Sequence, residues 1–131
     1  MNRPELKIIG TVRSSLKTLD DCPLQGAEGA PEAWLEIDAA FADAIKSLEP
    51  GQELIVLTWF HLADRSVLTC YPRKQTDVPH IGVFSTRSPD RPNPIGLHQV
   101  TIRDIQAQRI QVHPLEALDG TPVIDIKPVI S

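Results

Sequence analysis

The sequence predicts a mainly β protein, a small closed or nearly closed β-barrel with one short helix. Three observations lead to this prediction. Short apolar and β-branched runs recur along the chain, a single segment has helical spacing, and strands do not alternate with helices as in a parallel sheet. The length of 131 residues fits one domain, and no linker or repeat divides it, so we expect a single domain over 1–131.

The first half of the chain predicts two short strands and the helix. The strands are Leu6–Val12 and Trp34–Ile37. Between them, the run from Asp20 to Pro31 is rich in Gly, Ala, Pro and acidic residues, which is typical of a long mobile loop. After Asp38 as N-cap, apolar residues at 41, 44, 45 and 48 repeat at helical spacing, and Pro50-Gly51 ends the helix.

The second half predicts strands throughout. Glu53–His61 is the most apolar segment and is expected to run through the middle of the core. Asp119-Gly120 indicates a tight turn before the last strand. The remaining short strands are expected at Ser66–Tyr71, Ile81–Thr86, Leu97–Arg103, Arg109–His113 and Val123–Ile126.

Composition narrows the class of protein. The net charge of −4 disfavours a general nucleic-acid coat, but it is unevenly placed: residues 1–64 hold five Lys or Arg against eleven Asp or Glu, and residues 65–131 hold eight against six. The second half therefore permits a local anionic partner such as RNA. The chain has no apolar run of the ~20 residues needed to span a membrane. It also has no signal peptide and no CxxC pair. We expect a cytoplasmic protein with reduced thiols and no membrane association.

The segment GVFSTRSPDRPNPIGL, from Gly82 to Leu97, is the most informative stretch. Its three prolines fix φ and remove backbone donors, so the centre of the segment is neither helix nor central strand. Arg87, Arg91 and Asn93 lie on this stiff loop, which holds polar groups at fixed positions as a binding site requires. The alternative is a Pro-rich surface turn with incidental charge.

Other site patterns are missing from the sequence. The four histidines His61, His80, His98 and His113 do not have metal-ligand spacing, so we expect no metal site. No G-x-S-x-G, P-loop or G-x-G motif occurs, which excludes the usual glycine-rich nucleotide cradles. The residues alone lead to a β-barrel with a rigid Arg-bearing loop and do not identify a cofactor.

The segment resembles the diagnostic motif of the TrmO family, also called TsaA-like, written roughly G-V-F-A-T-R-S-x-x-R-P-N-P-I-G. Three further blocks are similar to family blocks in the same order: IGTVRSS at Ile9–Ser15, LTWFH at Leu57–His61 and LDGTPVIDIKP at Leu118–Pro128. The resemblance implies a β-barrel methyltransferase that uses S-adenosylmethionine without a Rossmann fold, forms a homodimer and methylates N6 of threonylcarbamoyladenosine at position 37 of tRNA.

The resemblance also implies a set of site residues. Asp119 and His61 are the candidate catalytic bases, and Arg91 and Asn93 are the candidates for substrate contacts or for bracing the loop. The cofactor site would comprise Pro23, Leu24, Gln25, His61, Leu62, Arg87, Leu97, Leu118, Asp119, Gly120 and Thr121.

Each assignment has a structural alternative. Arg87 can pair with the carboxylate of the cofactor's methionine moiety, or form a salt bridge at the barrel rim. Asp119 can accept from a ribose hydroxyl or an amine, or simply form its turn; main-chain groups of Leu97, Leu118 and Gly120 can meet the adenine edge. His61 is a ligand or a core histidine. Phe84 is expected in the barrel core rather than as a stacking platform.

The chain departs from the family pattern at Leu24, where the family has arginine, and at Leu62, where it often has an amide. The sequence also lacks the C-terminal extension of longer members. These departures leave two alternatives: a non-catalytic barrel that binds RNA or S-adenosylmethionine, and a methyltransferase with another acceptor.

Overall fold

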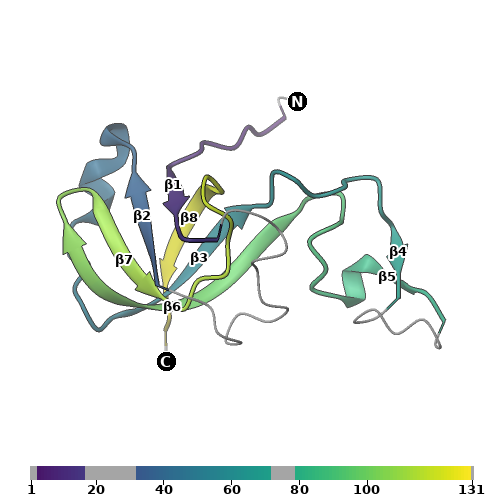
Figure 1. The fold of residues 1–131 in the computed structure, drawn as a ribbon. Coiled ribbons are helices and arrows are strands. Elements are labelled where there is room, and N and C mark those ends of the chain that lie inside the picture. The colour runs from purple at the N-terminus through teal and green to yellow at the C-terminus, as the bar shows by residue number, and fades with distance from the viewer. Residues whose placement is uncertain (1–2, 17–31, 72–78, 131) are drawn as a thin grey trace.

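The computed structural model describes residues 3–16, 32–71 and 79–130, and six strands of these residues close into a barrel (Figure 1). Neighbours around the barrel follow the order β1-β2-β7-β6-β3-β8, and β8 pairs with β1 to complete the ring. The expected β-barrel is therefore confirmed. The strands are β1 (Gly10–Arg13), β2 (Ala33–Ile37), β3 (Glu53–Trp59), β6 (Ile95–Gln106), β7 (Arg109–His113) and β8 (Pro122–Pro128).

The long strand β6 links the two sides of the barrel. Its first half pairs with β3, from Ile95 opposite Trp59 to Thr101 opposite Glu53, and its second half pairs with β7. Thr101 pairs with both neighbours, and the β6–β7 register shifts just beyond it, between Ile102 and Asp104. Such an irregularity bends a strand, as closure of a small barrel requires.

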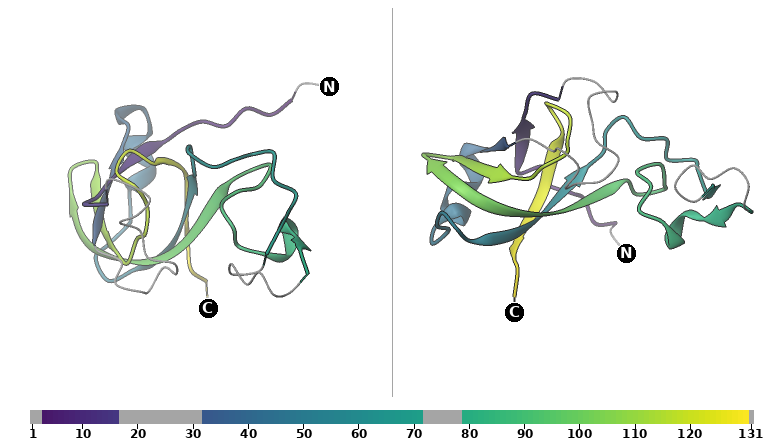
Figure 2. Two further views of the ribbon diagram at one scale, coloured as in Figure 1. Left: turned by 45° about the vertical axis from the view of Figure 1, so that its right-hand side comes forward. Right: turned by 60° about the horizontal axis from the view of Figure 1, so that its bottom comes forward.

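Residues 60–94 leave the barrel between β3 and β6, and we call their described part the lobe. It carries a separate two-stranded sheet, β4 (Thr69–Cys70) with β5 (Ile81–Gly82), and the 3₁₀ helix η4 (Val83–Ser85). The views in Figures 1 and 2 agree that the lobe lies beside the barrel. The strands expected at Ser66–Tyr71 and Ile81–Thr86 are thus much shorter than predicted and do not belong to the barrel.

The helix expected after Asp38 is present as the 3₁₀ helix η2 (Ala39–Ile45). Its backbone is kinked at Phe41 (φ −114°, ψ 15°), and the side chain of Asp38 makes no capping hydrogen bond. The segment is too short for α-helical propagation to be favourable by itself, so packing against the barrel decides its form. The loop expected from Asp20 to Pro31 lies outside the described residues.

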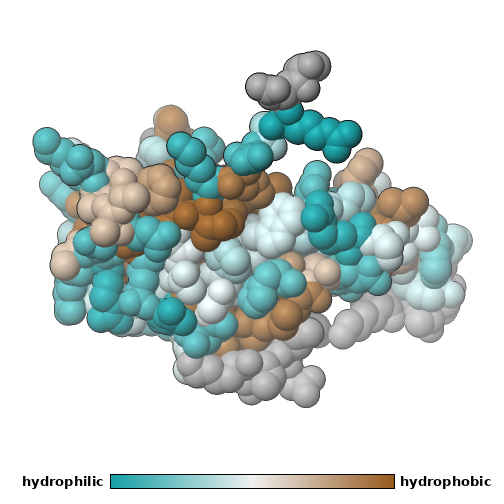
Figure 3. All heavy atoms as spheres, turned by 90° about the horizontal axis from the view of Figure 1, so that it is seen from above, coloured by the Kyte–Doolittle hydropathy of each residue, from teal (hydrophilic) through white to brown (hydrophobic). Residues whose placement is uncertain are grey.

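Several large apolar side chains lie on the surface. Figure 3 shows brown, apolar patches between teal, polar residues on the face seen from above. On the outer side of the barrel, Leu97 lies opposite Leu57 and is 53% exposed, while Ile95 lies opposite Trp59 and is 43% exposed. In the lobe, Leu62, Leu68 and Phe84 are exposed as well. Exposed apolar side chains that are neighbours on one strand face, as Ile95 and Leu97 are on β6, are typical of an interaction surface.

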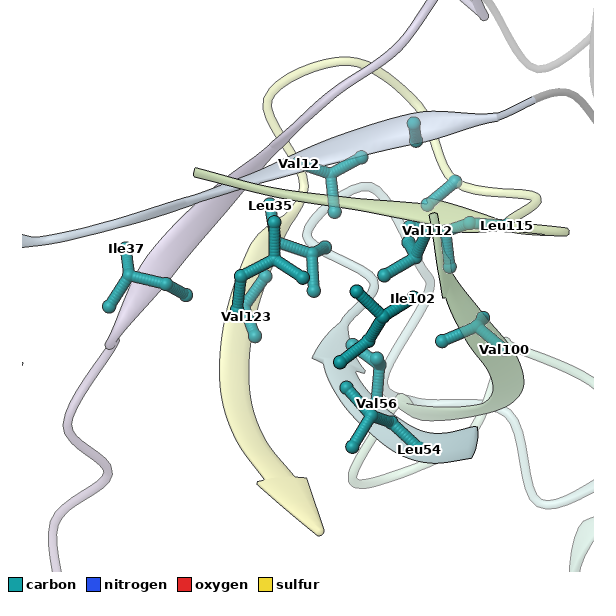
Figure 4. Close-up of a cluster of buried hydrophobic side chains, with 13 residues drawn as sticks. Val12, Leu35, Ile37, Leu54, Val56, Val100, Ile102, Val112, Leu115 and Val123 are labelled. Atoms are coloured by element: carbon teal, nitrogen blue, oxygen red, sulfur yellow. The ribbon is translucent and has the colours of Figure 1, made fainter. Parts of the chain in front are cut away.

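The interior of the barrel is filled by alternate residues of the strands. In β6, Val100 and Ile102 point inward while their neighbours are exposed or half-buried, as the two-residue period of a strand requires. The expected central strand Glu53–His61 is confirmed as β3, ending at Trp59, with Leu54 and Val56 fully buried. Each such side chain contributes ~1.5–3 kcal/mol to folding. Figure 4 shows this cluster, to which Val12, Leu35, Ile110, Val112 and Val123 also belong.

Candidate functional site

The turn at Leu118–Thr121 is held against the end of β1 by backbone hydrogen bonds. Gly120 N–H donates to the Val12 carbonyl over 2.7 Å, and Asp119 N–H donates to the Leu16 carbonyl over 2.7 Å. The Val12 N–H returns a bond of 2.8 Å to Thr121. Gly120 has φ +90°, which favours glycine, so the expected tight turn is confirmed.

Two main-chain groups proposed to meet adenine are already bonded within the protein. One is the Gly120 N–H, which donates to Val12. The other is the Leu118 carbonyl, which accepts from the Thr121 N–H over 3.1 Å and from the Thr121 hydroxyl over 2.7 Å. Leu97, the third residue proposed, lies on the outer side of β6.

The carboxylate of Asp119 is oriented by residues at the end of β1. Its Oδ1 accepts from the backbone N–H of Ser14 over 3.0 Å, and its Oδ2 is 3.9 Å from the guanidinium of Arg13. Arg13 also donates to Glu36 of β2. The hydrogen bond to Glu36, with the negative charges of Glu36 and Asp119, raises the pKa of Arg13. The turn thus presents a carboxylate with a fixed direction.

The Pro-rich loop of the lobe is braced by two arginines. Arg91 donates to the carbonyls of Thr86 over 2.8 Å and Ser88 over 3.1 Å. Arg65 donates to the Pro92 carbonyl over 2.7 Å and to Asn93 Oδ1 over 3.2 Å, and its guanidinium lies 4.9 Å from the centre of the Trp59 ring. Arg91 and Asn93 thus both take part in hydrogen bonds within the lobe, which fits the bracing alternative, and their contacts with substrate stay a prediction.

Arg65 was missed by the sequence analysis. It lies outside the Gly82–Leu97 segment, and its partners are a main-chain carbonyl and an amide oxygen, for which no sequence pattern exists. The backbone N–H of Asp64 adds a bond of 2.8 Å to Asp90 of the same loop. The stiffness expected from the prolines is therefore reinforced by contacts from residues 64 and 65.

Arg87 and Phe84 project from the braced loop into solvent. Arg87 is exposed and makes no hydrogen bond or ion pair with the described part of the chain. Phe84 is 85% exposed, so the prediction that it lies in the barrel core is wrong. The chain turns into η4 after Gly82 instead of continuing β5, and this turn buries Val83 and directs Phe84 outward.

The histidines are also placed differently from expectation. His61 follows β3 at the start of the lobe and is exposed, as is its neighbour Leu62, so the core alternative for His61 is wrong. The buried histidine is His98, whose Nε2 lies 2.8 Å from the Thr58 hydroxyl inside the barrel. Burial lowers the pKa of His98 to about 4. Its inward position could be found from the alternation of β6.

Within the described residues, the lobe, which carries Arg87, and the turn at Leu118–Thr121, which carries Asp119, are separate parts of the structure. In the views of Figures 1 and 2, the lobe lies away from the loop that leads into β8. Pro23, Leu24 and Gln25 lie outside the described residues. One chain therefore offers an exposed cation, Arg87, on the lobe and an oriented carboxylate, Asp119, on the barrel.

A shallow cavity of about 280 Å³ lies elsewhere, between η2 and the barrel. Its lining is apolar apart from Asp125, and it includes none of the expected site residues. The described residues contain no cluster of His, Cys, Asp or Glu suited to a metal ion. Within the same part of the chain, none of the helices has the length and apolar character needed to cross a membrane.

Comparison with known proteins gives consistent matches. The family model described as the tRNA-methyltransferase O N-terminal domain matches residues 11–131. The chain is 44% identical over 130 residues to a probable S-adenosyl-L-methionine-binding protein of Methanothermobacter thermautotrophicus, covering 98% of this chain and 93% of the relative. It is also 44% identical over 122 residues to an S-adenosyl-L-methionine-binding protein of Archaeoglobus fulgidus, covering 93% and 86%.

A solved structure supports the same comparison. The crystal structure of TrmO from Pseudomonas aeruginosa matches with a TM-score of 0.78 and 32% sequence identity, covering 98% of this chain and 57% of that chain. The present chain therefore spans little more than half the length of that solved structure.

Proposed function

Because the chain belongs to the tRNA-methyltransferase O family, we propose that it is an S-adenosylmethionine-dependent methyltransferase that acts on tRNA. Residues 1–131 would form its single domain. The finer proposal is N6-methylation of threonylcarbamoyladenosine at position 37. The basic second half of the chain supports an anionic substrate, and an anticodon loop offers unpaired bases and phosphates to such a surface.

The observation that supports cofactor binding most directly is the exposed guanidinium of Arg87 on a braced loop. A guanidinium presents a planar fork that matches a carboxylate, such as the one in the methionine moiety of S-adenosylmethionine. Because Arg65 and Arg91 hold the loop through its carbonyls, the backbone that carries Arg87 is held in place before a ligand arrives. The residues present therefore fit this cofactor.

Asp119 fits the polar part of the same ligand. Its carboxylate is oriented by Ser14 and Arg13, and it can accept a hydrogen bond from a ribose hydroxyl or from the cofactor's amine. The remaining cofactor contacts would come from Pro23, Leu24, Gln25, His61, Leu62, Leu97, Leu118, Gly120 and Thr121.

We further propose that the protein acts as a homodimer. Arg87 and Asp119 lie on separate parts of one chain, and a two-fold axis can bring the lobe of one copy to the turn of the other. The exposed apolar side chains of the lobe and of the outer face of β6 offer a surface for this association. The second copy would then complete the cofactor site.

The protein's contribution to methyl transfer is mainly position and charge. When bound, S-adenosylmethionine supplies an electrophilic methyl group. Asp119 or exposed His61 would take the proton from the substrate nitrogen, whose threonylcarbamoyl substituent makes it relatively acidic. The two candidates differ in surroundings, since Asp119 is already in contact with Ser14 and Arg13.

Mass spectrometry of tRNA nucleosides tests the proposal. The protein is incubated with S-adenosylmethionine and tRNA that carries or lacks threonylcarbamoyladenosine, and the digested nucleosides are analysed. Methylated product on the modified tRNA alone supports the finer proposal. Cofactor binding without product on either tRNA contradicts it and favours another methyl acceptor or a non-catalytic binding protein; failure to bind S-adenosylmethionine overturns the proposal as a whole.

A further inference from the structure

The guanidinium of Arg13 lies between two carboxylates. Its Nε donates to Glu36 of the neighbouring strand β2, and its Nη1 is 3.9 Å from Oδ2 of Asp119. The other oxygen of Asp119 accepts from the Ser14 N–H. Within the described residues, Oδ1 of Asp119 accepts from the Ser14 N–H and Oδ2 faces the Arg13 guanidinium, and these two partners are adjacent residues at the end of β1.

The side chains involved differ in exposure. Those of Arg13 and Glu36 are 50% and 42% exposed, whereas that of Asp119 is 26% exposed. Ion pairs as exposed as these contribute little to folding stability, because water and salt screen them. They can nevertheless fix a rotamer, and a fixed rotamer is what a ligand contact requires.

A second arginine beside Glu36, on the outer face of the barrel, can be compared with Arg13. Arg109 of β7 lies opposite Glu36 in the strand register, on the side away from β1. Its guanidinium is 4.4 Å from the centre of the Trp34 ring instead of bridging toward the turn. Of these two arginines beside Glu36, Arg13 is the one that reaches Asp119.

We propose that Arg13 is a positioning residue for S-adenosylmethionine binding: it orients the carboxylate of Asp119 toward the ligand, and Glu36 holds Arg13 in place. This inference rests on the proposed function, in which Asp119 contacts the cofactor. Arg13 itself does not touch the ligand. Its removal therefore weakens cofactor binding only through Asp119.

A double-mutant cycle on cofactor affinity tests this role. Calorimetric titration with S-adenosylmethionine is carried out on the full chain and on Arg13→Gln, Asp119→Asn and the double variant, with thermal unfolding recorded for each. We expect Arg13→Gln to weaken binding about 3- to 10-fold with little change in melting temperature, and to have no further effect in the Asp119→Asn background. Glu36→Gln should act in the same direction with a smaller change, and Arg13→Lys should restore part of the affinity.

The matched control is Arg109→Gln, which removes a guanidinium from the same face and should leave the affinity unchanged. Normal binding by Arg13→Gln, with weakened binding by Asp119→Asn, would overturn the positioning role while leaving Asp119 in the cofactor site. Equal losses from Arg13→Gln with and without Asp119 would also overturn it. Unchanged affinity in Asp119→Asn would remove both the site assignment and this inference, and a parent chain that does not bind the cofactor would refute the proposed function itself.

Discussion

The backbone N–H of Ser14 donates to Oδ1 of Asp119 over 3.0 Å and joins two segments separated by 105 residues in the sequence. The Ser14 hydroxyl adds a bond of 2.8 Å to the Ala117 carbonyl. The blocks Ile9–Ser15 and Leu118–Pro128, distinct in the sequence, thus form one structural unit. This unit orients the carboxylate that we propose for the cofactor site, whereas the cation proposed for the same site, Arg87, belongs to the lobe.

Replacement of Arg87 tests the charge assigned to the lobe. Arg87→Ala should lower the affinity for S-adenosylmethionine about 10- to 100-fold, because it removes the charge-assisted pair proposed between Arg87 and the carboxylate of the cofactor. Its melting temperature should not change, since Arg87 has no hydrogen bond or ion pair with the described residues. Arg3→Ala, an exposed arginine of the N-terminal segment, is the control in calorimetric titration. Normal affinity in Arg87→Ala would move the carboxylate contact elsewhere.

Replacement of Gly96 tests how closely side chains inside the barrel pack against this position of β6. A Cβ at this position would lie 2.5 Å from the Thr58 hydroxyl oxygen and 2.8 Å from His98 Nε2. Gly96→Ala should therefore lower the free energy of unfolding by ~1–3 kcal/mol. The control is Gly82→Ala, where no atom lies within 4 Å of the added carbon. Chemical denaturation should show a change within about 0.5 kcal/mol for the control. Equal stabilities of the two variants would contradict the close packing at Gly96.

His98 gives the stability a defined pH dependence. Its pKa is lowered from 6.5 to about 4 in the folded protein because burial penalises the imidazolium. Between these values the unfolded chain binds more protons than the folded one, so the free energy of unfolding falls as the pH falls. Above pH 6.5 the protonation of His98 takes nothing from the free energy of unfolding. Near pH 4 it has lowered that free energy by ~3 kcal/mol.

The His98→Gln variant isolates this effect, because its amide can still hydrogen-bond to Thr58 without titrating. Denaturation midpoints measured from pH 7 to pH 4 should fall more steeply for the parent protein than for His98→Gln. Identical pH profiles would show that another group is responsible. An NMR titration of the His98 ring near its ordinary pKa would contradict the burial directly.

The barrel could be predicted from the sequence because buried and exposed positions alternate along its strands, and this alternation is visible as a pattern of apolar and polar residues. β7 has the bounds that were expected, and β3 differs from its expected range only in ending at Trp59 instead of His61. The lobe could not be predicted in the same way. The lobe contains few buried apolar residues among those described, and hydrogen bonds to carbonyls and amides hold it together. Hydrophobic patterning therefore assigned η4 and Phe84 to a strand of the barrel.

The candidate site likewise has features that could be predicted from the sequence and features that could not. The turn at Asp119-Gly120 was predictable because glycine at a positive φ has a clear sequence signal. The bracing by Arg65, the outward direction of His61 and the exposure of Phe84 depend on the path of the chain between residues 60 and 94. Separation of Arg87 from Asp119 likewise follows from the three-dimensional arrangement. The sequence does not contain this information in a local pattern.

Complementation between two defective variants tests the shared site most directly. Arg87→Ala and Asp119→Ala are each purified, mixed under conditions that exchange subunits, and titrated with S-adenosylmethionine. If one copy supplies Arg87 and the other supplies Asp119, a mixed dimer has one intact site. At statistical exchange, about a quarter of the parent's binding sites should be recovered. No recovery above the two separate variants, with exchange verified by mass spectrometry of the intact dimers, would contradict a site shared between copies.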